Sequence, residues 1–141
     1  MIVIILDTNV VSALMRNPPD SAVIALLDKR ARESIWTTSI TLFEIRFGIE
    51  RLPNSRRRND LENGFRRAFE NMFEGRLITF DSDAAQSAAL LSADRVRRGE
   101  TVEMRDTMIG GIVISRRAEF ATHNVRHFGD LGVPVLNPWS A

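Results

Sequence analysis

Cysteine is absent from this chain of 141 residues, which excludes disulfide bonds, thiolate metal sites and cysteine nucleophiles. Histidine is scarce as well: His123 and His127 are the only two, and they stand four positions apart. Because a zinc site with no thiolate and no third histidine would need carboxylate ligands, we interpret both histidines as surface or packing residues.

Long hydrophobic runs are also missing. No apolar run approaches the roughly 20 residues that cross a bilayer, and residues 1–6 have no basic leader and are too short for a signal-peptide core. The chain is 44% hydrophobic and 26% charged, which is typical of a globular protein, and its length suits one domain over residues 1–141. We therefore expect a soluble cytoplasmic protein with no membrane partner.

Lysine is almost absent. Lys29 is the only lysine among the 19 basic residues, and all the others are arginines, although the net charge is only +1. The planar guanidinium makes bidentate contacts with phosphate, which favours a nucleic-acid partner. A genome of high GC content would enrich arginine equally well. The densest cluster comprises Arg51, Arg56, Arg57, Arg58, Arg66 and Arg67.

Strand-like and helix-like segments alternate along the chain. Residues 2–6 are an unbroken aliphatic run, which suits a strand buried on both faces of a parallel sheet. Apolar spacing and turn signals predict further strands at 34–37, 77–80, 119–122 and 133–136, and helices at 9–15, 20–32, 39–52, 54–74, 82–99 and 106–116. This order predicts an α/β fold with a parallel sheet of about five strands flanked by helices.

Two acidic residues stand where a merely structural role would not require them. Asp7 follows the first predicted strand, and ligands of open parallel sheets bind at the carboxyl ends of strands; the alternative is that it only caps the next helix. Glu44 falls within or beside an apolar stripe that includes Phe43 and Phe47, and glutamate is rarely buried unless it is paired. The alternative for Glu44 is a capping box with Thr41.

Asp106 precedes a segment, 107–114, that is too apolar for an exposed helix. Asp106 could be a simple N-cap of that helix. The pair Gly110-Gly111 within the helix costs about 1 kcal/mol per glycine relative to alanine. That cost predicts the close approach of another backbone or of a ligand.

Three carboxylates at one edge of a sheet would repel one another. At about 4 Å and an effective dielectric constant near 20, each like-charged pair costs roughly 4 kcal/mol, and a divalent cation removes the conflict. Oxygen ligands suit Mg²⁺, with Mn²⁺ as an alternative. Such an ion lowers the pKa of bound water and stabilises attack on a phosphodiester. We therefore predict that Asp7, Glu44 and Asp106 hold a catalytic metal ion.

Four segments, in order, resemble the motifs of PIN domains, especially those of the VapC and FitB toxins of bacterial toxin–antitoxin pairs. They are Asp7-Thr-Asn-Val-Val-Ser12, Thr38-Ser-Ile-Thr-Leu-Phe-Glu-Ile-Arg-Phe-Gly48 with Arg51-Leu-Pro53, Arg105-Asp-Thr-Met-Ile-Gly-Gly111, and Ala121-Thr-His-Asn-Val-Arg-His-Phe128 followed by Val135-Leu-Asn-Pro-Trp139. Each segment alone is a weak match, but the ordered set covers nearly the whole chain.

The resemblance implies a single PIN domain with a Rossmann-like fold. It implies a Mg²⁺-dependent endoribonuclease that cleaves structured RNA, such as tRNA or rRNA, through a metal-activated water. It also implies a homodimer, or a hetero-oligomer with a cognate antitoxin that inhibits the enzyme. The pair would contact operator DNA only through the antitoxin. Asp7, Glu44 and Asp106 match the three core acidic positions. Asn9 is expected to orient Asp7, and Thr122 to hydrogen-bond within the site.

The last motif departs from the family pattern, which often has a fourth acidic residue. Asn124 occupies the nearer position, and His127 stands where Asp or Glu often follows the arginine. Asn124 can still hold a metal-bound water. The departure leaves open whether the site holds one metal ion or two.

An acidic pocket alone would repel RNA, so cationic partners are needed near it. Arg56, Arg57 and Arg58 follow the predicted helix that bears Glu44, and we predict that they contact RNA phosphates. The alternatives are a solvated helix start and a surface that faces the dimer or the antitoxin.

Two other functions compete with the nuclease. A phosphotransfer protein with an acceptor aspartate needs a lysine near the phosphate, whereas Lys29 lies in a predicted helix. A dehalogenase-type phosphatase also needs a second aspartate where Asn9 stands. A catalytically inactive PIN-like module that acts in a regulatory complex is the non-enzymatic alternative, and the retention of all three carboxylates argues against it.

Overall fold

Five short parallel strands form the sheet at the centre of the molecule. Residues 1–140 are described by the computed structural model. The strands are β1 (Ile4–Leu6), β2 (Ile35–Thr38), β3 (Leu77–Ile78), β4 (Glu119–Ala121) and β5 (Val135–Leu136). Their order across the sheet is β3-β2-β1-β4-β5, and every neighbouring pair is parallel. The predicted α/β class with a five-stranded parallel sheet is confirmed.

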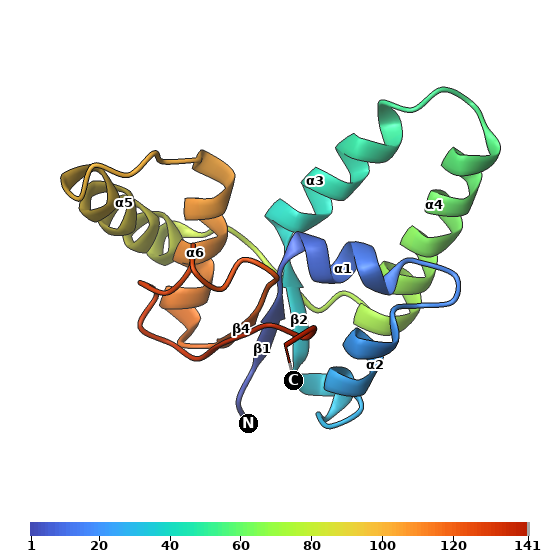
Figure 1. The fold of residues 1–141 in the computed structure, drawn as a ribbon, viewed down its shortest axis with the longest axis horizontal. Coiled ribbons are helices and arrows are strands. Elements are labelled where there is room, and N and C mark those ends of the chain that lie inside the picture. Colours follow the sequence, from blue (N-terminus) through green and yellow to red (C-terminus); the bar gives the residue numbers. More distant parts are fainter. Residues whose placement is uncertain (141) are drawn as a thin grey trace.

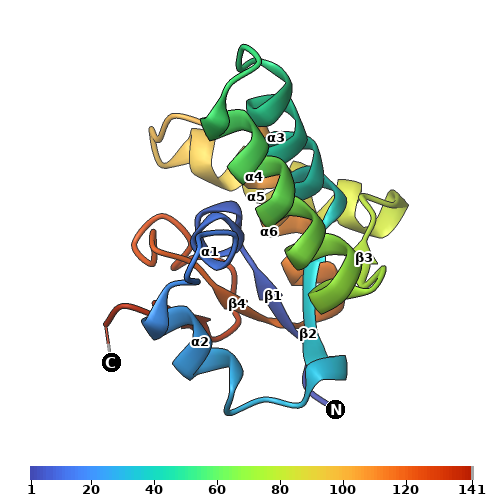
Figure 2. The same cartoon turned by 90° about the vertical axis from the view of Figure 1, so that its right-hand side faces the viewer.

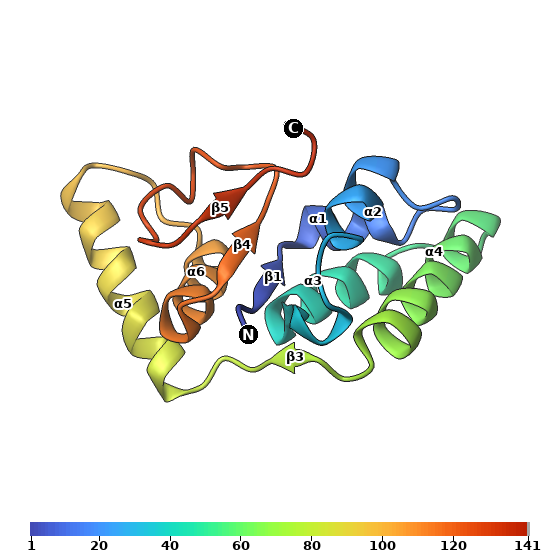
Figure 3. The same cartoon turned by 90° about the horizontal axis from the view of Figure 1, so that it is seen from below.

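Helices cover both faces of this sheet (Figures 1 and 3). They are α1 (Thr8–Leu14), α2 (Ser21–Leu27), α3 (Ser39–Glu50), α4 (Arg56–Arg66), α5 (Ser82–Arg97) and α6 (Met104–Arg116), with the short helical turns η1 (Arg32–Ser34) and η2 (Arg67–Phe73). Central strand β1 serves two cores: Ile4 and Leu6 pack with α1 to α4 and η2, whereas Ile5 packs with α5 and α6. Within residues 1–140, no helix combines the length and apolar character that a membrane span requires.

Side-chain caps fix the helix starts. Asp20 caps α2, and Asp81, not Ser82, caps α5. Glu103 caps α6, which begins at Met104 and not at the predicted Asp106. The Glu103 carboxylate accepts a hydrogen bond from the Asp106 N–H, which carries this helix back beyond its predicted start.

Predicted boundaries also shift at the ends of other elements. Strands β1, β3, β4 and β5 are shorter than the predicted segments, because pairing extends only where a neighbouring strand exists: Ile2, inside the predicted first strand, is 66% exposed. Strand β2 keeps its predicted length and is shifted by one position. Helix α2 ends at Leu27 instead of near Arg32, and the turn η1 then leads into β2.

The predicted helix over 54–74 is divided in two. α4 is a regular helix, and its continuation η2 is a wider π-helical turn. An aromatic stripe runs through both parts: the rings of Phe65, Phe69 and Phe73 follow one another with centroids 4.7 and 5.5 Å apart, and Phe73 is fully buried. The stripe covers the first core, whereas the rest of α4 is charged.

The glycine pair of α6 lets this helix approach α5 closely. A Cβ atom added at Gly111 would lie 2.5 Å from the Ala84 carbonyl oxygen and 2.7 Å from the Ala88 Cβ, and one added at Gly110 would lie 2.8 Å from Leu91. The predicted close approach is therefore confirmed, and the backbone that approaches belongs to α5.

Gly111→Ala should consequently destabilise the protein by about 1–3 kcal/mol, because overpacking forces two helices apart. Gly48→Ala in α3 is the matched control, since a Cβ there meets nothing within 4 Å. That variant should gain up to about 1 kcal/mol from better helix propensity. Urea unfolding of both proteins checks the prediction, and equal stabilities would contradict it.

Candidate active site

The predicted site residues lie at the carboxyl-terminal edge of the sheet. Asp7 follows β1, Glu44 lies on the helix that follows β2, and Thr122 follows β4. Strands β2 and β3 lie on one side of β1, and β4 and β5 lie on the other. Asp7 and Thr122 therefore stand at the topological switch point, where open α/β sheets bind their ligands.

Asp7 is a buried carboxylate held by three donors. Its Oδ1 accepts from the Thr8 N–H at 2.8 Å, and its Oδ2 accepts from the Thr122 hydroxyl at 2.7 Å and from the Asn9 amide at 3.2 Å. Asp7 does cap α1, but the hydrogen bond from Thr122, which follows β4, has no part in a helix cap. Burial raises the pKa of Asp7 above its ordinary value, the hydrogen bonds oppose this shift, and the nearby Asp106 carboxylate adds to it.

Glu44 faces Asp7 from α3. Its Oε1 accepts from the Thr8 hydroxyl at 2.9 Å, and its Oε2 lies 3.8 Å from a guanidinium nitrogen of Arg105. Burial raises the pKa of Glu44, the contacts with Thr8 and Arg105 oppose the shift, and the charges of Asp7 and Asp106 add to it.

Both structural interpretations of Glu44 from the sequence need correction. The capping box is wrong, because Thr38 is the N-cap of α3 and accepts from the Thr41 N–H at 3.1 Å. The apolar stripe is real in sequence but does not face the core: Phe43 and Phe47 are 57% and 48% exposed, and the buried face of α3 is formed by Thr41, Ile45 and Ile49.

Asp106 lies in the first turn of α6, where Glu103 is the cap, so the N-cap interpretation of Asp106 is wrong. Its Oδ2 lies 3.0 Å from His127 Nε2. His127 therefore contacts a candidate catalytic carboxylate, a role beyond the surface or packing position expected for it.

A buried arginine positions this histidine, and the sequence analysis missed it. Arg95 on α5 is 1% exposed and donates to both Asp130 oxygens at 3.0 Å and to the His127 carbonyl at 2.8 Å. Arg98 also binds Asp130 at 2.6 Å. The two arginines, Arg95 first, hold the pKa of Asp130 down to about 2. The available signal was spacing, since residues 84, 88, 91 and 95 define the core face of α5.

The supporting residues predicted from the motifs differ in their placement. Asn9 links two strand ends: its amide nitrogen donates to Asp7, and its oxygen accepts from the His123 N–H at 3.0 Å. The Thr122 hydroxyl accepts from the Asn124 N–H at 3.1 Å, and the Asn124 side chain is exposed. Thr8, which sequence reasoning did not single out, is the residue that connects Asp7 with Glu44.

The three carboxylates influence one another electrostatically and offer only oxygen atoms as ligands. The charge of Asp106 raises the pKa of Asp7, and those of Asp7 and Asp106 raise the pKa of Glu44. Within residues 1–140, no three acidic or histidine side chains stand close enough to enclose an ion by themselves. Mg²⁺ fits such a donor set, because it keeps several waters and binds through few carboxylates.

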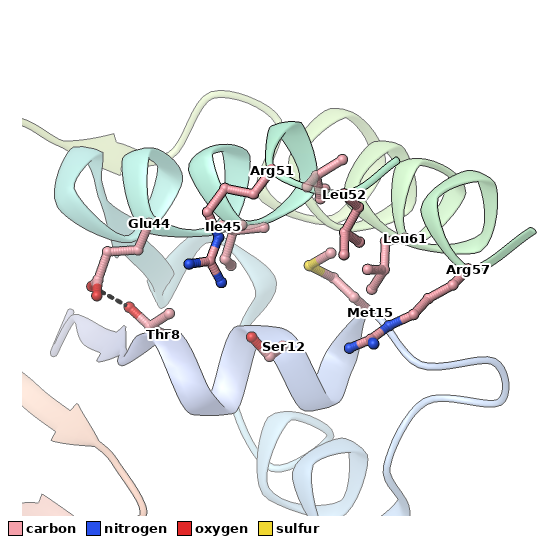
Figure 4. Close-up of a pocket in the computed structure, with 11 residues that line it drawn as sticks. Thr8, Ser12, Met15, Glu44, Ile45, Arg51, Leu52, Arg57 and Leu61 are labelled. Atoms are coloured by element: carbon pink, nitrogen blue, oxygen red, sulfur yellow. Dashed lines mark hydrogen bonds between the residues drawn. The ribbon is translucent and has the colours of Figure 1, made fainter. Parts of the chain in front are cut away.

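A cleft of about 280 Å³ begins at Thr8 and Glu44 and is lined by side chains of α1, α3 and α4 and of the loop between α3 and α4 (Figure 4). The ribbon in Figure 2 shows how these three helices are arranged. Arg51 and Arg57 line the cleft, and we call it the arginine cleft. It provides positive charge beside the carboxylates.

The predicted arginine triplet does not act as a unit in the structure. Arg57 reaches the arginine cleft, whereas Arg56 lines a separate hollow with Asp60. Arg58 is engaged within the fold, donating to the Leu52 carbonyl at 2.8 Å. Successive residues of a helix point in different directions, so a run of three arginines cannot share one face.

Comparison with known proteins identifies the class to which this fold and site belong. The PIN domain family model matches residues 4–132. The chain therefore belongs to the PIN domain family.

Its relatives include toxins. VapC ribonuclease Y4jK of Sinorhizobium fredii is 33% identical over 96% of this chain and 97% of its own length. Toxin FitB of Neisseria gonorrhoeae is 30% identical over 96% of this chain and 98% of its own length. The crystal structure of FitAcB from Neisseria gonorrhoeae superposes with a TM-score of 0.84 at 30% identity, covering 98% of this chain and 99% of that one. DNA-bound VapBC from Salmonella typhimurium has a TM-score of 0.79 at 25% identity, covering 98% and 99% of the two chains.

Proposed function

We propose that this protein is a Mg²⁺-dependent endoribonuclease toxin of a type II toxin–antitoxin pair, acting in the cytoplasm on structured RNA such as tRNA or rRNA. The observation that carries the proposal is the buried Asp7 at the switch point of the sheet, linked through Thr8 to Glu44, with the pKa values of both carboxylates raised in part by the charge of Asp106. Perturbed carboxylates in such a place are typical of catalytic sites. Relatives named as ribonuclease and toxin support the same function.

Asp7, Glu44 and Asp106 would hold the ion, with Mn²⁺ as a substitute for Mg²⁺. When bound, it supplies a nucleophilic water at neutral pH and stabilises the charge of the phosphodiester under attack. Thr122 and Asn9 fix the orientation of Asp7, and Thr8 fixes that of Glu44. Such support of ligands by surrounding hydrogen bonds maintains both metal affinity and activity.

His127 and Arg57 complete the proposed machinery. His127 contacts one oxygen of Asp106, and the other oxygen would bind the ion. Arg57 in the arginine cleft would bind an RNA phosphate beside Glu44. Asn124 is exposed, and its amide would hold a water of the ion.

We further propose that the toxin forms a homodimer or a hetero-oligomer with a cognate antitoxin that inhibits it, and that the pair meets operator DNA only through the antitoxin. Solved relatives are described as toxin–antitoxin complexes with DNA bound. On α3, Phe43 and Phe47 stack with centroids 5.9 Å apart while about half exposed. Large exposed aromatic side chains of this kind favour a protein interface.

The test is an assay of purified, antitoxin-free protein on total tRNA and rRNA. Cleavage should require Mg²⁺ or Mn²⁺ and stop when EDTA is added, because the three carboxylates cannot act on a phosphodiester without the cation. A protein that binds its partner and cleaves no RNA with either metal would instead be a non-enzymatic PIN-like module.

A further inference from the structure

A second hollow lies beside the candidate active site, away from the arginine cleft. It has a volume of about 310 Å³ and is lined by Asn9, Arg16, His123 and Trp139. His123 and Trp139 follow strands β4 and β5, whereas the arginine cleft is built with α3, which follows β2. The two depressions therefore approach Asp7 from opposite sides of β1.

A chain of hydrogen bonds ties this hollow to the carboxylates. The Asn9 oxygen accepts from the His123 N–H at 3.0 Å, and the Asn9 nitrogen donates to Asp7 Oδ2 at 3.2 Å. One side chain thus forms part of the hollow and also holds a candidate metal ligand. A molecule bound in the hollow would lie next to the reaction centre.

The lining of the hollow has the chemistry that recognises a nucleotide. The rings of His123 and Trp139 lie edge to face, with centroids 5.6 Å apart, and His123 is exposed. The Arg16 side chain is 67% exposed, and its one ion pair within residues 1–140 is the 3.4 Å contact with Asp20. Aromatic rings stack with unpaired bases, and arginine binds the phosphate.

The ring of Trp139 is held in place before any ligand arrives. Trp139 is partly buried and packs against the hydrophobic core beside α1 and α2, so its ring is already positioned against the protein. Its backbone N–H donates to the Asn137 side chain at 3.0 Å. A fixed ring loses little conformational entropy when a base stacks on it.

We propose that the hollow formed by Asn9, Arg16, His123 and Trp139 binds an unpaired nucleotide of the RNA beside the cleaved bond, with its base on the rings and its phosphate on Arg16. This subsite rests on the proposed ribonuclease function and adds a residue-level account of which RNA is accepted. RNA that presents a flipped or looped-out base next to the cleavage site would be preferred over a continuous duplex, in which the base is stacked and paired.

Intrinsic fluorescence offers a direct test without cleavage. The chain has two tryptophans, and Trp36 lies in β2, where its indole donates to the Glu33 carbonyl at 2.8 Å. Trp36→Phe leaves Trp139 as the only tryptophan. Single-stranded RNA hexamers, titrated into this protein in EDTA, should quench Trp139 emission in a saturable manner.

Three further substitutions in the same background separate stacking from charge. His123→Ala should weaken RNA binding by about 5-fold or more through the loss of one base–aromatic stack, and His123→Phe should restore it. The slope of log affinity against log salt is negative, and Arg16→Gln should make it less steep by about 0.7, the value for one phosphate contact on a single strand. Arg97→Gln replaces an exposed arginine that pairs with Asp94 on α5; it is the control and should change neither quantity.

Unquenched Trp139 at saturating RNA would overturn the subsite, as would His123→Ala and Arg16→Gln proteins that bind like the Arg97→Gln control. Quenching by hexaglutamate and not by RNA would assign the hollow to a protein partner and equally overturn it. The ribonuclease proposal is tested separately by cleavage with Mg²⁺. Quenching with both variant effects in a protein that never cleaves RNA would preserve the subsite and refute the nuclease.

Discussion

Asp7→Asn should reduce Mg²⁺-dependent RNA cleavage by at least about 100-fold, because even the partners that merely orient a metal ligand contribute about 10–100-fold. The substitution keeps the size of the side chain but removes the charge that would attract the cation. The same change should abolish growth arrest when the protein is expressed without its antitoxin. Cleavage rates at saturating Mg²⁺ and colony counts after induction measure the two effects.

Asp94→Asn is the matched control for Asp7→Asn. Asp94 is an aspartate of α5 whose side chain is 59% exposed, and its substitution should leave both rates and growth arrest unchanged. Circular dichroism must show that the Asp7→Asn protein is folded. A folded Asp7→Asn protein that remains as toxic as the parent would remove Asp7 from the catalytic site.

Asp130→Asn should lower the free energy of unfolding at neutral pH by about 3 kcal/mol, since it leaves the buried Arg95 guanidinium without its anion. The estimate takes the lower end of the range for broken buried pairs, because the Asp130 side chain is 23% exposed. The loss should also loosen His127, whose carbonyl binds the same guanidinium, and so weaken Mg²⁺ binding through Asp106.

The pH dependence of this effect has a definite sign. The folded pKa of Asp130 is about 2, below the ordinary value of 3.8. Its stabilising contribution is therefore complete above the ordinary value and disappears as the pH falls toward the folded pKa. Urea unfolding of parent and Asp130→Asn proteins should show a difference that is constant near neutrality and shrinks between about pH 4 and pH 2. A difference that stays the same across this range would mean that the ion pair does not stabilise the fold.

Much of the fold follows from local sequence signals. Strand β1 is recognisable because a strand buried on both faces needs an unbroken aliphatic run, and the alternation of Ile4 and Ile5 between two cores explains why that run has no polar position. The glycine pair of α6 also predicts a close contact from the sequence alone. A costly residue in a helix interior indicates a close contact, and Gly111 makes that contact with the backbone of α5.

Other features depended on contacts that no local pattern contains. The first turn of α6 was misplaced because Glu103 outcompetes Asp106 as the cap. The sequence places Phe43 and Phe47 of α3 in an apolar stripe, but the buried residues of this helix are Thr41, Ile45 and Ile49. Helical spacing identifies a stripe but does not tell whether the protein's own sheet or another molecule covers it.

Some residues of the candidate active site can be found from the sequence, and others only from the structure. Sequence motifs select Asp7, Glu44 and Asp106 individually, whereas Thr8 as their link and Arg95 as the anchor of His127 become visible only in three dimensions. Both act through hydrogen bonds between segments far apart in the chain. A lone buried arginine on a core face, such as Arg95, is nevertheless a usable signal, because arginine is almost never fully buried unless it is paired.

The bond between Asp7 and Thr122 joins residues that are 115 positions apart. A ribosome adds roughly 5–20 residues per second, so about 6 s or more separate the synthesis of these two residues. Throughout that interval the growing chain carries Asp7 without β4 beside it, and the carboxylate cannot be aligned. Under the proposed function, the nuclease site would stay incomplete until almost the whole polypeptide has emerged, and this delay would give an antitoxin already present in the cell time to bind the new chain.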